Sequence, residues 1–247
     1  MRLIVLASGS AGNGYVLYND DTAIVLEAGV HIKELHKAYG YDVKRIAACL
    51  ITHEHKDHCG FVEQYLEAGI PVYASAGTIE GMAIDDKYKH SIHPMQEMEA
   101  TEIGHWSVIP FHTQHDGLEP FGFVIAHPEC GNVMFATDTY YIKDRFTNLN
   151  NIMIECNYVP EILDQNVADG KLPFIVKRRT LKSHMSLPKC IETLRDHDLK
   201  KVVNIVLVHM STGNGDAERM REEVGLATGK RVFVAEAGLS IDFNSSF

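Results

Sequence analysis

Residues 52–60, T-H-E-H-K-D-H-C-G, constrain what this chain can fold into more than any other part of its sequence. They follow an apolar, β-branched segment, 46–52, which predicts a strand. His53 and His55 are one residue apart, so on extended backbone their rings point to the same side of the chain. Two imidazoles in that arrangement can reach a single metal ion.

The second half of the same stretch predicts a second ion. We expect the chain to turn after the strand, so that Asp57 and His58 address a cation a few ångströms from the first, with a helix beginning near Cys59 and Gly60. The alternative is a polar loop whose histidines cap a helix or satisfy core groups. The length and specificity of H-x-H-x-D-H after an apolar strand favour the metal hypothesis.

The rest of the chain alternates strand-like and helix-like segments. Apolar runs predict strands near residues 3–7, 15–18, 23–26, 46–52, 72–74, 108–111, 121–126, 133–136, 152–154 and 202–208. Apolar spacing and capping residues predict helices near 32–39, 61–66, 187–194 and 217–224. The absence of a low-complexity linker predicts one domain over residues 1–247, with sheet inside and helices outside.

Composition limits the class of protein further. No apolar run approaches the ~20 residues that a membrane-spanning helix needs. The five cysteines are scattered without a C-x-x-C pair, so we expect the reducing cytoplasm rather than a disulfide framework. The net charge of −10 argues against a broad basic surface for long nucleic acid. It does not exclude phosphate substrates, because bound cations reverse the local field.

The chain resembles the metallo-β-lactamase superfamily, whose signature H-x-H-x-D-H stands intact at His53, His55, Asp57 and His58. The resemblance implies an αββα four-layer sandwich of two mixed sheets with helices outside. It also implies three further metal ligands: a lone histidine at the first metal, an aspartate that bridges both metals, and a final histidine at the second.

Candidates for the lone histidine and the bridge lie in the middle of the chain. His115, in F-H-T-Q-H-D, matches the lone histidine, because the family pattern places His-Asp before the next strand. His112, three residues earlier, is the competing ligand. Asp138, in F-A-T-D-T, matches the bridge. One carboxylate between two ions ~3.5–4 Å apart is what a two-metal hydrolase requires.

Two histidines compete for the closing position. His209 ends the most apolar strand of the C-terminal half, which would aim its ring rigidly, so we assign it to the second metal. His184, in K-S-H-M-S, is expected to protonate the leaving group. The equivalent residue does so in phosphodiesterases similar to the carbon-phosphorus-pathway cyclic phosphodiesterase. The opposite assignment, with His184 closing the second site, stays open.

The full predicted ligand set uses one residue twice. The first ion is assigned to His53, His55, His115 and Asp138, and the second to Asp57, His58, Asp138 and His209. Asp57 is also expected to orient the attacking hydroxide. Nitrogen and carboxylate ligands without thiolate favour two Zn²⁺ ions, with Mn²⁺ or Fe²⁺ as alternatives.

Weaker signals bear on the substrate. The loop at 9–13, the E-C-N segment at 155–157 and H-M-S at both His184 and His209 look like the WalJ/YycJ-like branch, which contains phosphodiesterases and nucleases. The chain departs from the family at Glu27, usually aspartate, and from that branch at Ser183, usually glycine, and Tyr158, often histidine.

A basic cluster precedes His184, and we expect it to clamp phosphate oxygens; its members are Lys177, Arg178, Arg179 and Lys182. A solvated basic loop is the alternative. Asn157 is a further substrate-binding candidate.

The sequence therefore predicts a two-metal phosphodiesterase that uses a metal-bridging hydroxide. Its substrate would be a nucleotide, a cyclic nucleotide or a nucleic-acid end, and a homodimer is compatible with the sequence. The alternative is hydrolysis of a carbonyl ester such as a lactone, thioester or β-lactam, and the third hypothesis is a non-catalytic metal-binding protein.

Overall fold

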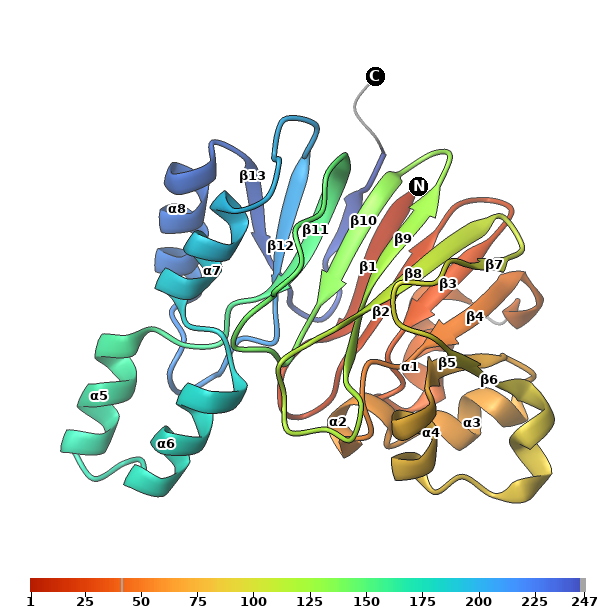
Figure 1. Cartoon of the computed structure of the whole chain (residues 1–247), viewed down its shortest axis with the longest axis horizontal. Helices are drawn as coiled ribbons and strands as arrows, with labels where there is room; N and C mark the ends of the chain where they lie inside the picture. Colours follow the sequence, from red (N-terminus) through yellow and green to blue (C-terminus); the bar gives the residue numbers. More distant parts are fainter. Residues whose placement is uncertain (41, 245–247) are drawn as a thin grey trace.

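Two mixed sheets lie face to face in the computed structural model, which describes residues 1–40 and 42–244 (Figure 1). Across the first seven-stranded sheet of the described residues the order is β14 (Ser240–Asp242), β1 (Arg2–Ala7), β2 (Gly14–Tyr18), β3 (Ala23–Leu26), β4 (Ile46–Leu50), β5 (Val72–Ser75) and β6 (Ile92–Met95). Across the second it is β13 (Arg231–Val234), β12 (Asn204–Val208), β11 (Leu149–Glu155), β10 (Gly131–Ala136), β9 (Phe121–His127), β8 (Trp106–His112) and β7 (Thr101–Ile103).

The main core fills the space between the sheets. Tyr15 from the first sheet meets Phe135 from the second edge to face, with ring centroids 5.5 Å apart. Trp106 and Phe123 are fully buried in the same layer. Each such side chain contributes about 1.5–3 kcal/mol when it leaves water. This layer therefore fixes how the two sheets, and the loops at their edges, lie against each other.

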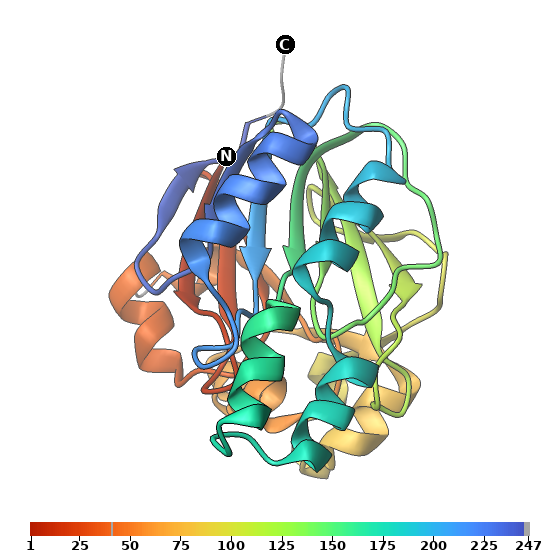
Figure 2. The ribbon, with the colours of Figure 1, turned by 90° about the vertical axis from the view of Figure 1, so that its left-hand side faces the viewer.

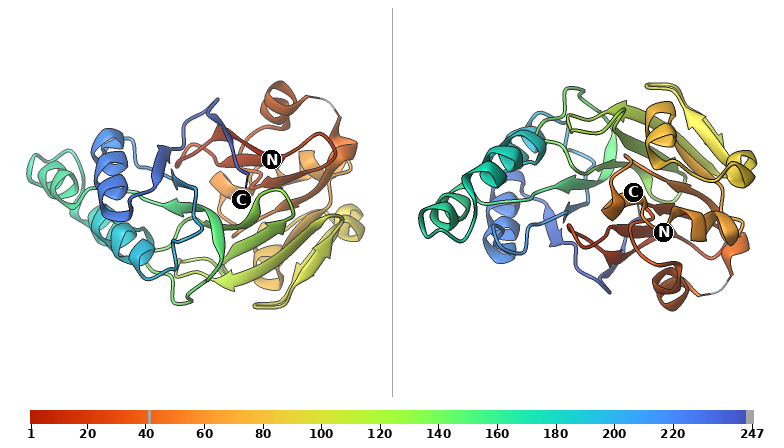
Figure 3. Two further views of the ribbon diagram at one scale, coloured as in Figure 1. Left: turned by 90° about the horizontal axis from the view of Figure 1, so that it is seen from above. Right: turned by 90° about the horizontal axis from the view of Figure 1, so that it is seen from below.

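Helices cover the outer faces of both sheets, as Figures 2 and 3 show. All helices of the described residues, whether or not they cover a sheet, are α1 (Ile32–Tyr39), α2 (Lys56–Cys59), α3 (Val62–Glu67), α4 (Ala76–Met82), α5 (Pro160–Ala168), α6 (Phe174–Ser183), α7 (Leu187–Arg195) and α8 (Ala217–Thr228), with 3₁₀ turns η1 (Val43–Arg45) and η2 (Asp86–Ser91). Leu35 and Tyr65 pack on the first sheet, and Leu194 and Val224 on the second. The predicted four-layer αββα sandwich is confirmed.

One pair of helices stands outside the four layers. α5 and α6 form a hairpin that projects from the end of the second sheet (Figures 1 and 2). The basic cluster lies on α6, so the segment is a helix rather than a loop. Arg178, Arg179 and Lys182 are exposed on it, and the choice between a phosphate clamp and a solvated surface stays a prediction. The sequence pattern missed this hairpin because many of its apolar side chains face water. It also missed β6, β7, β13 and β14, each three or four residues long.

Two boundaries near the histidine motif differ from the predictions. β4 ends at Leu50 rather than Thr52, and α2 begins at Lys56 rather than near Cys59. The carbonyl of His55 accepts hydrogen bonds from the backbone N–H groups of His58 and Cys59, at 2.9 and 3.0 Å, which starts the helical turn early. No helix in the described part of the chain is long and apolar enough to cross a membrane.

Candidate metal centre

The centre forms where parallel strands end. β3 pairs with β4 in the first sheet, and β10, β11 and β12 run parallel in the second. Carboxyl ends of parallel strands meet at one edge of a sheet, where open α/β sheets place their ligands. The loops that leave β4, β10 and β12 carry His53, Asp138 and His209, and these three residues belong to adjoining clusters.

The histidine motif is fixed by backbone contacts on both sides. The N–H of Asn13 donates to the carbonyl of Asp57 at 2.8 Å, and the N–H of Ala28 donates to the carbonyl of His58 at 2.7 Å. A Cβ on Gly29 would collide with the carbonyl oxygen of Asp57, so this approach requires glycine. The motif is therefore held rigidly against the loops that follow β1 and β3.

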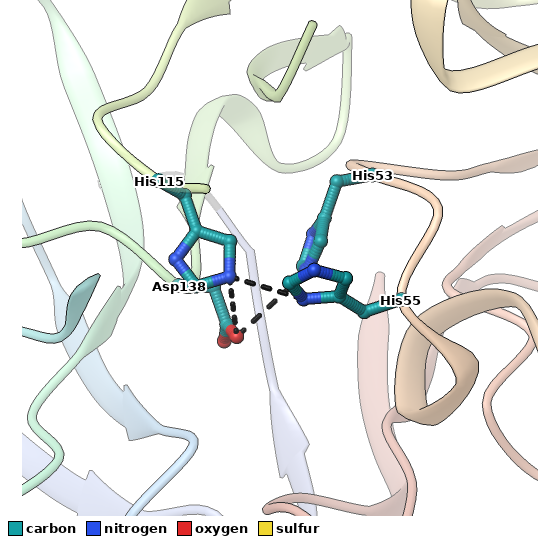
Figure 4. A group of neighbouring side chains, drawn as sticks. All are labelled: His53, His55, His115 and Asp138. Carbon is teal, nitrogen blue, oxygen red and sulfur yellow. Dashed lines mark hydrogen bonds and ion pairs between the residues drawn. The ribbon is translucent and has the colours of Figure 1, made fainter. Parts of the chain in front are cut away.

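Four predicted ligands form the first cluster: His53, His55, His115 and Asp138 (Figure 4). Their candidate ligand atoms all lie within 4.8 Å of one another. Nε2 of His115 is 3.2 Å from Nδ1 of His55 and 3.4 Å from Oδ2 of Asp138. The side chains come from three separate loops, so only the folded chain brings them together.

The second cluster contains Asp57, His58, Asp138 and His209, again within 4.8 Å. Nε2 of His58 is 3.3 Å from Oδ2 of Asp57 and 3.5 Å from Oδ2 of Asp138. Nδ1 of His209 is 3.3 Å from Oδ1 of Asp138. Asp138 belongs to both clusters, and its two carboxylate oxygens are turned toward different sets of histidines.

Three residues of the centre have left-handed backbone. The φ angles are +68° at Glu27, +45° at Asp138 and +54° at His209, each just after a strand. Such angles are uncommon outside glycine and cost of order 1–3 kcal/mol each, so the surrounding structure must enforce them. Here they turn the chain sharply, which aims the three side chains inward.

The donor set fits a divalent cation. Nε2 of His53 is buried and has no hydrogen-bond partner among the described residues; Oδ2 of Asp138 is 3.8 Å from it, beyond hydrogen-bond range. An unpaired polar atom in the interior is costly unless a ligand satisfies it. Imidazole and carboxylate groups converge on this atom, which is the chemistry of Zn²⁺, Mn²⁺ or Fe²⁺ sites.

Charge at the first cluster differs from charge at the second. Burial and the neighbouring His58 hold the pKa of His53 well below its usual range, and burial lowers the pKa of His115. Burial opposes a charge on His209 as well, but Asp138 and its neighbouring carboxylates outweigh burial and raise the pKa of His209 to about 10. His53 and His115 thus present neutral imidazoles, which are ready to ligate a cation.

The acidic groups complete this charge balance. Burial opposes ionisation of Asp138, but His209 and His58 hold its pKa well below the usual range. His209 and His58 likewise lower the pKa of Asp57 against the effect of burial. The carboxylates therefore stay ionised, and protons on His58 and His209 carry the positive charge that a bound cation would supply.

Glu27 supports the motif despite replacing the usual aspartate. It accepts a 2.6 Å hydrogen bond from the Thr52 hydroxyl and a 3.3 Å bond from the Thr52 N–H. Its Oε1 lies 3.3 Å from Nδ1 of His58. Nδ1 of His58 has no hydrogen-bond partner among the described residues, so this contact is electrostatic: against the effect of burial, the negative charge of Glu27, with that of Asp138, raises the pKa of His58. The longer side chain reaches its partners from a left-handed backbone position.

Glu155 is a site residue that the sequence analysis did not single out by itself. Its fully buried carboxylate lies 2.7 Å from Nδ1 of His184 and accepts from the N–H of Thr139 at 2.8 Å. Asp138, Glu155, His184 and His209 form a third cluster within 4.8 Å. The sequence did contain one indication of Glu155: it is an acidic residue at the end of an apolar strand, within the E-C-N segment.

A cavity of about 260 Å³ opens over the two clusters. It is lined by Ser10, His55, Asp57, His115, Asp138, Val176, Arg179, Thr180, His184 and His209. Arg179 is the one member of the basic cluster on this lining; Lys177 pairs instead with Asp164 at 2.7 Å, and Arg178 and Lys182 line a separate hollow. The predicted clamp is thus divided between two faces of α6.

Two other candidates lie outside the cavity lining. Asn157 is buried beneath His209, where its side-chain amide donates to the His209 carbonyl at 2.8 Å. That contact suits a residue that positions His209 rather than one that touches substrate. His112 ends β8 and belongs to none of the three clusters formed by the described residues.

Sequence comparison identifies the family. The model described as the Beta-lactamase superfamily domain matches residues 22–210, more than half of the chain. The chain belongs to this superfamily. Exodeoxyribonuclease YycJ of Bacillus anthracis is 28% identical over 255 residues, covering 96% of this chain and 93% of that protein.

Solved structures support the same fold. The metallo-β-lactamase fold protein YhfI from Bacillus subtilis superposes with a TM-score of 0.72 at 15% identity, covering 98% of this chain and 99% of YhfI. A diphosphatase from the PhnP family has a TM-score of 0.68 at 16% identity, covering 100% of this chain and 99% of the diphosphatase. The chain therefore has the metallo-β-lactamase fold, and its His/Asp clusters are consistent with a metal site.

Proposed function

We propose that this member of the superfamily is a two-metal phosphodiesterase that cleaves a nucleotide or nucleic-acid phosphodiester. The observation that carries the proposal is the position of Asp138 in both four-residue clusters, with one carboxylate oxygen near His115 and the other near His209. A carboxylate shared in this way holds two cations side by side, as two-metal hydrolases require.

The ligand assignment follows from the two clusters. One ion is held by His53, His55, His115 and Asp138, and the other by Asp57, His58, Asp138 and His209, with Zn²⁺ favoured over Mn²⁺ and Fe²⁺. When bound, the ions supply a water nucleophile that is deprotonated near neutral pH, together with positive charge for the attacked group.

Residues of the chain itself carry the other steps. The side chain of Asp57 is 24% exposed and lines the cavity, so its carboxylate can orient the attacking water there. Arg179 also lines the cavity and presents a planar guanidinium to two oxygens of a phosphate.

His184 is the proposed proton donor. Nδ1 of its ring lies 2.7 Å from Oε1 of Glu155, and this contact orients the ring with its other nitrogen, Nε2, free to serve the cavity. Burial works against a charged ring, but Glu155 beside it raises the pKa of His184. A protonated His184 can pass the Nε2 proton to the leaving oxygen.

The phosphodiester is favoured over a carbonyl ester by two observations. Arg179 places a guanidinium on the cavity lining, 3.6 Å from the exposed carboxylate of Asp116, and this cation suits an anionic phosphodiester better than a neutral lactone. The relative from B. anthracis that aligns over nearly its whole length is an exodeoxyribonuclease.

A substrate screen tests the proposal. Protein reloaded with Zn²⁺ or Mn²⁺ is expected to hydrolyse bis-p-nitrophenyl phosphate and at least one of linear DNA, RNA, cyclic mononucleotides and cyclic dinucleotides. Asp57→Ala, prepared in parallel, should lose this turnover and so excludes a contaminating nuclease. Hydrolysis of nitrocefin or a lactone without any phosphodiester would establish the carbonyl-ester alternative instead. Metal-loaded protein that is inert toward every ester would leave a metal-binding role.

A further inference from the structure

α6 presents a second surface beside the metal centre. Its C-terminal end is tied to the centre, because the carbonyl of Ser183 lies 3.0 Å from Nδ1 of His115. On its outer side is a hollow of about 350 Å³, lined by Ile175, Val176, Arg178, Arg179 and Lys182. Val176 and Arg179 line both this hollow and the cavity over the clusters, so the two adjoin each other on either side of these side chains.

The hollow has an apolar floor that solvent reaches. Ile175 is 69% exposed, Val176 41% and Phe174, at the start of the same helix, 66%. These side chains sit on the hairpin that projects from the four layers (Figures 1 and 2). Phe174 and Ile175 lie at the start of α6, within one helical turn of Arg178, and only Ile175 and Val176 line the hollow itself. Large apolar side chains left exposed to water in one segment are typical of an interaction site, because burying them in the core would otherwise be favourable.

Positive charge flanks this floor in a chain whose net charge is −10. Arg178 and Lys182 are exposed, lie one helical turn apart, and form no ion pair within residues 1–40 and 42–244. Their neighbours differ: Lys177 pairs with Asp164 at 2.7 Å, and Arg179 reaches Asp116 at 3.6 Å. Two unneutralised cations beside an apolar hollow suit an anionic ligand with flat apolar groups.

We infer that this face of α6, formed by Phe174, Ile175, Arg178 and Lys182, binds the nucleotide beyond the scissile phosphate of a single-stranded nucleic-acid end. The inference rests on the proposed function and narrows its substrate class. Bases stack on apolar and aromatic side chains while basic side chains follow the backbone. A small cyclic nucleotide would fit within the 260 Å³ cavity and leave this face bare, whereas a polymer end would cover both.

Charge argues against a second copy of the chain as the occupant. A twofold interface brings the same patch of both subunits together. The basic patch with Arg178 and Lys182 would then meet a second basic patch, and no carboxylate is among the described residues that line the hollow. A phosphate backbone supplies the missing charge.

The test uses matched charge-removal variants. Arg178→Ala/Lys182→Ala removes the two free cations of α6. Lys33→Ala/Lys37→Ala makes the same change in charge at the same helical spacing on α1, at exposed positions that line neither the cavity nor the hollow and lie away from α6 (Figures 1 and 3). Ile175→Ser removes part of the apolar floor without a change in charge.

Binding is measured by fluorescence anisotropy of a labelled single-stranded oligonucleotide with chelator-treated protein, which prevents cleavage. The α6 double variant is expected to bind about tenfold more weakly than wild type, and the slope of log Kd against log salt should fall by about 1.4, which corresponds to two lost phosphate contacts. Ile175→Ser should weaken binding without changing that slope. The α1 control should match wild type.

Turnover separates this inference from the proposed function. With reloaded metal, kcat/KM of the α6 double variant should fall further for the oligonucleotide than for bis-p-nitrophenyl phosphate. If the α6 and α1 variants bind the oligonucleotide equally well, the surface inference is wrong even where wild type hydrolyses bis-p-nitrophenyl phosphate. If wild type sediments as a dimer that Ile175→Ser dissociates, a second copy is the occupant. If wild type hydrolyses no phosphodiester, the proposed function and this inference fall together.

Discussion

The metal centre and the α5–α6 hairpin meet across one cavity but are built in opposite ways. His58, Asp138 and His209 are at most 3% exposed and lie against several charged partners. On the hairpin, Ile175 is 69% exposed and Arg178 is without an ion-pair partner in the described part of the chain. The difference teaches that many contacts fix the positions of the candidate ligands, whereas few contacts fix the positions of the side chains that would meet a substrate.

The largest expected effect is on metal binding, and it comes from replacing Asp138, the residue shared by both clusters. Asp138→Ala removes the carboxylate shared by both clusters and leaves His58 and His209 without their buried counter-charge. We expect metal affinity to fall by more than about 100-fold, since loss of a mere supporting partner already costs 10–100-fold. Elemental analysis should find fewer bound ions, and phosphodiester turnover should be lost.

Asp116→Ala is the control for that loss. Asp116 is also an aspartate near His115, at 3.1 Å, but its side chain is 51% exposed and it belongs to none of the metal-type clusters of the described residues. It should keep both ions. Full metal content and turnover in Asp138→Ala would disprove the shared-ligand assignment.

The next prediction separates a proton donor from a metal ligand. His184→Gln should keep both ions but lower kcat by roughly 10²-fold or more for diesters with a poor leaving group. p-Nitrophenyl esters should lose much less, because p-nitrophenolate leaves without a proton. Elemental analysis beside the two rates checks this. If His184→Gln instead lost one ion, His184 rather than His209 would close the second site.

A backbone substitution probes the rigidity of the centre. Gly29→Ala places a Cβ against the carbonyl of Asp57, so the motif must shift, and we expect unfolding to become easier by about 1–3 kcal/mol. Gly213→Ala meets no atom within 4 Å and serves as control. Chemical denaturation of both variants measures the difference in the free energy of unfolding. Equal midpoints would show that the loop at Gly29 can move away from Asp57 without a loss of stability.

The smallest effect belongs to the hairpin. Leu181 is 47% exposed on α6, so Leu181→Gln should change the free energy of unfolding by no more than about 0.5 kcal/mol. Thermal or urea unfolding tests this value. A much larger loss would mean that the hairpin is packed as tightly as the metal centre, and the contrast between the two regions would not hold.

Sequence patterns were most informative where chemistry and periodicity coincide. H-x-H-x-D-H after an apolar strand located four candidate ligands, and the predicted sandwich is confirmed. The site roles themselves stay predictions. α6 was missed because Phe174, Ile175 and Val176 face water, which removes the one-sided apolar pattern of a packed helix.

Sequence patterns also failed to predict contacts between site residues that lie far apart along the chain. Glu155 lies 29 residues from His184 along the chain, and Asn157 lies 52 from His209, so no local pattern announces either contact. The acid at the end of β11 was visible as part of E-C-N, but its partner was not. The Asn157–His209 contact depends on how β11 and β12 align, and the Glu155–His184 contact depends on where α6 ends against β11; a single sequence specifies neither.

The left-handed backbone at Glu27, Asp138 and His209 sets selection for stability against selection for activity. Glycine at these three positions would relax the main chain, yet it would delete the proposed shared ligand, the proposed closing ligand and the carboxylate behind the histidine motif. A library screened only for heat resistance should therefore drift toward glycine here and lose the proposed metal centre. A stabilisation campaign has to hold these three codons fixed and seek its gains elsewhere.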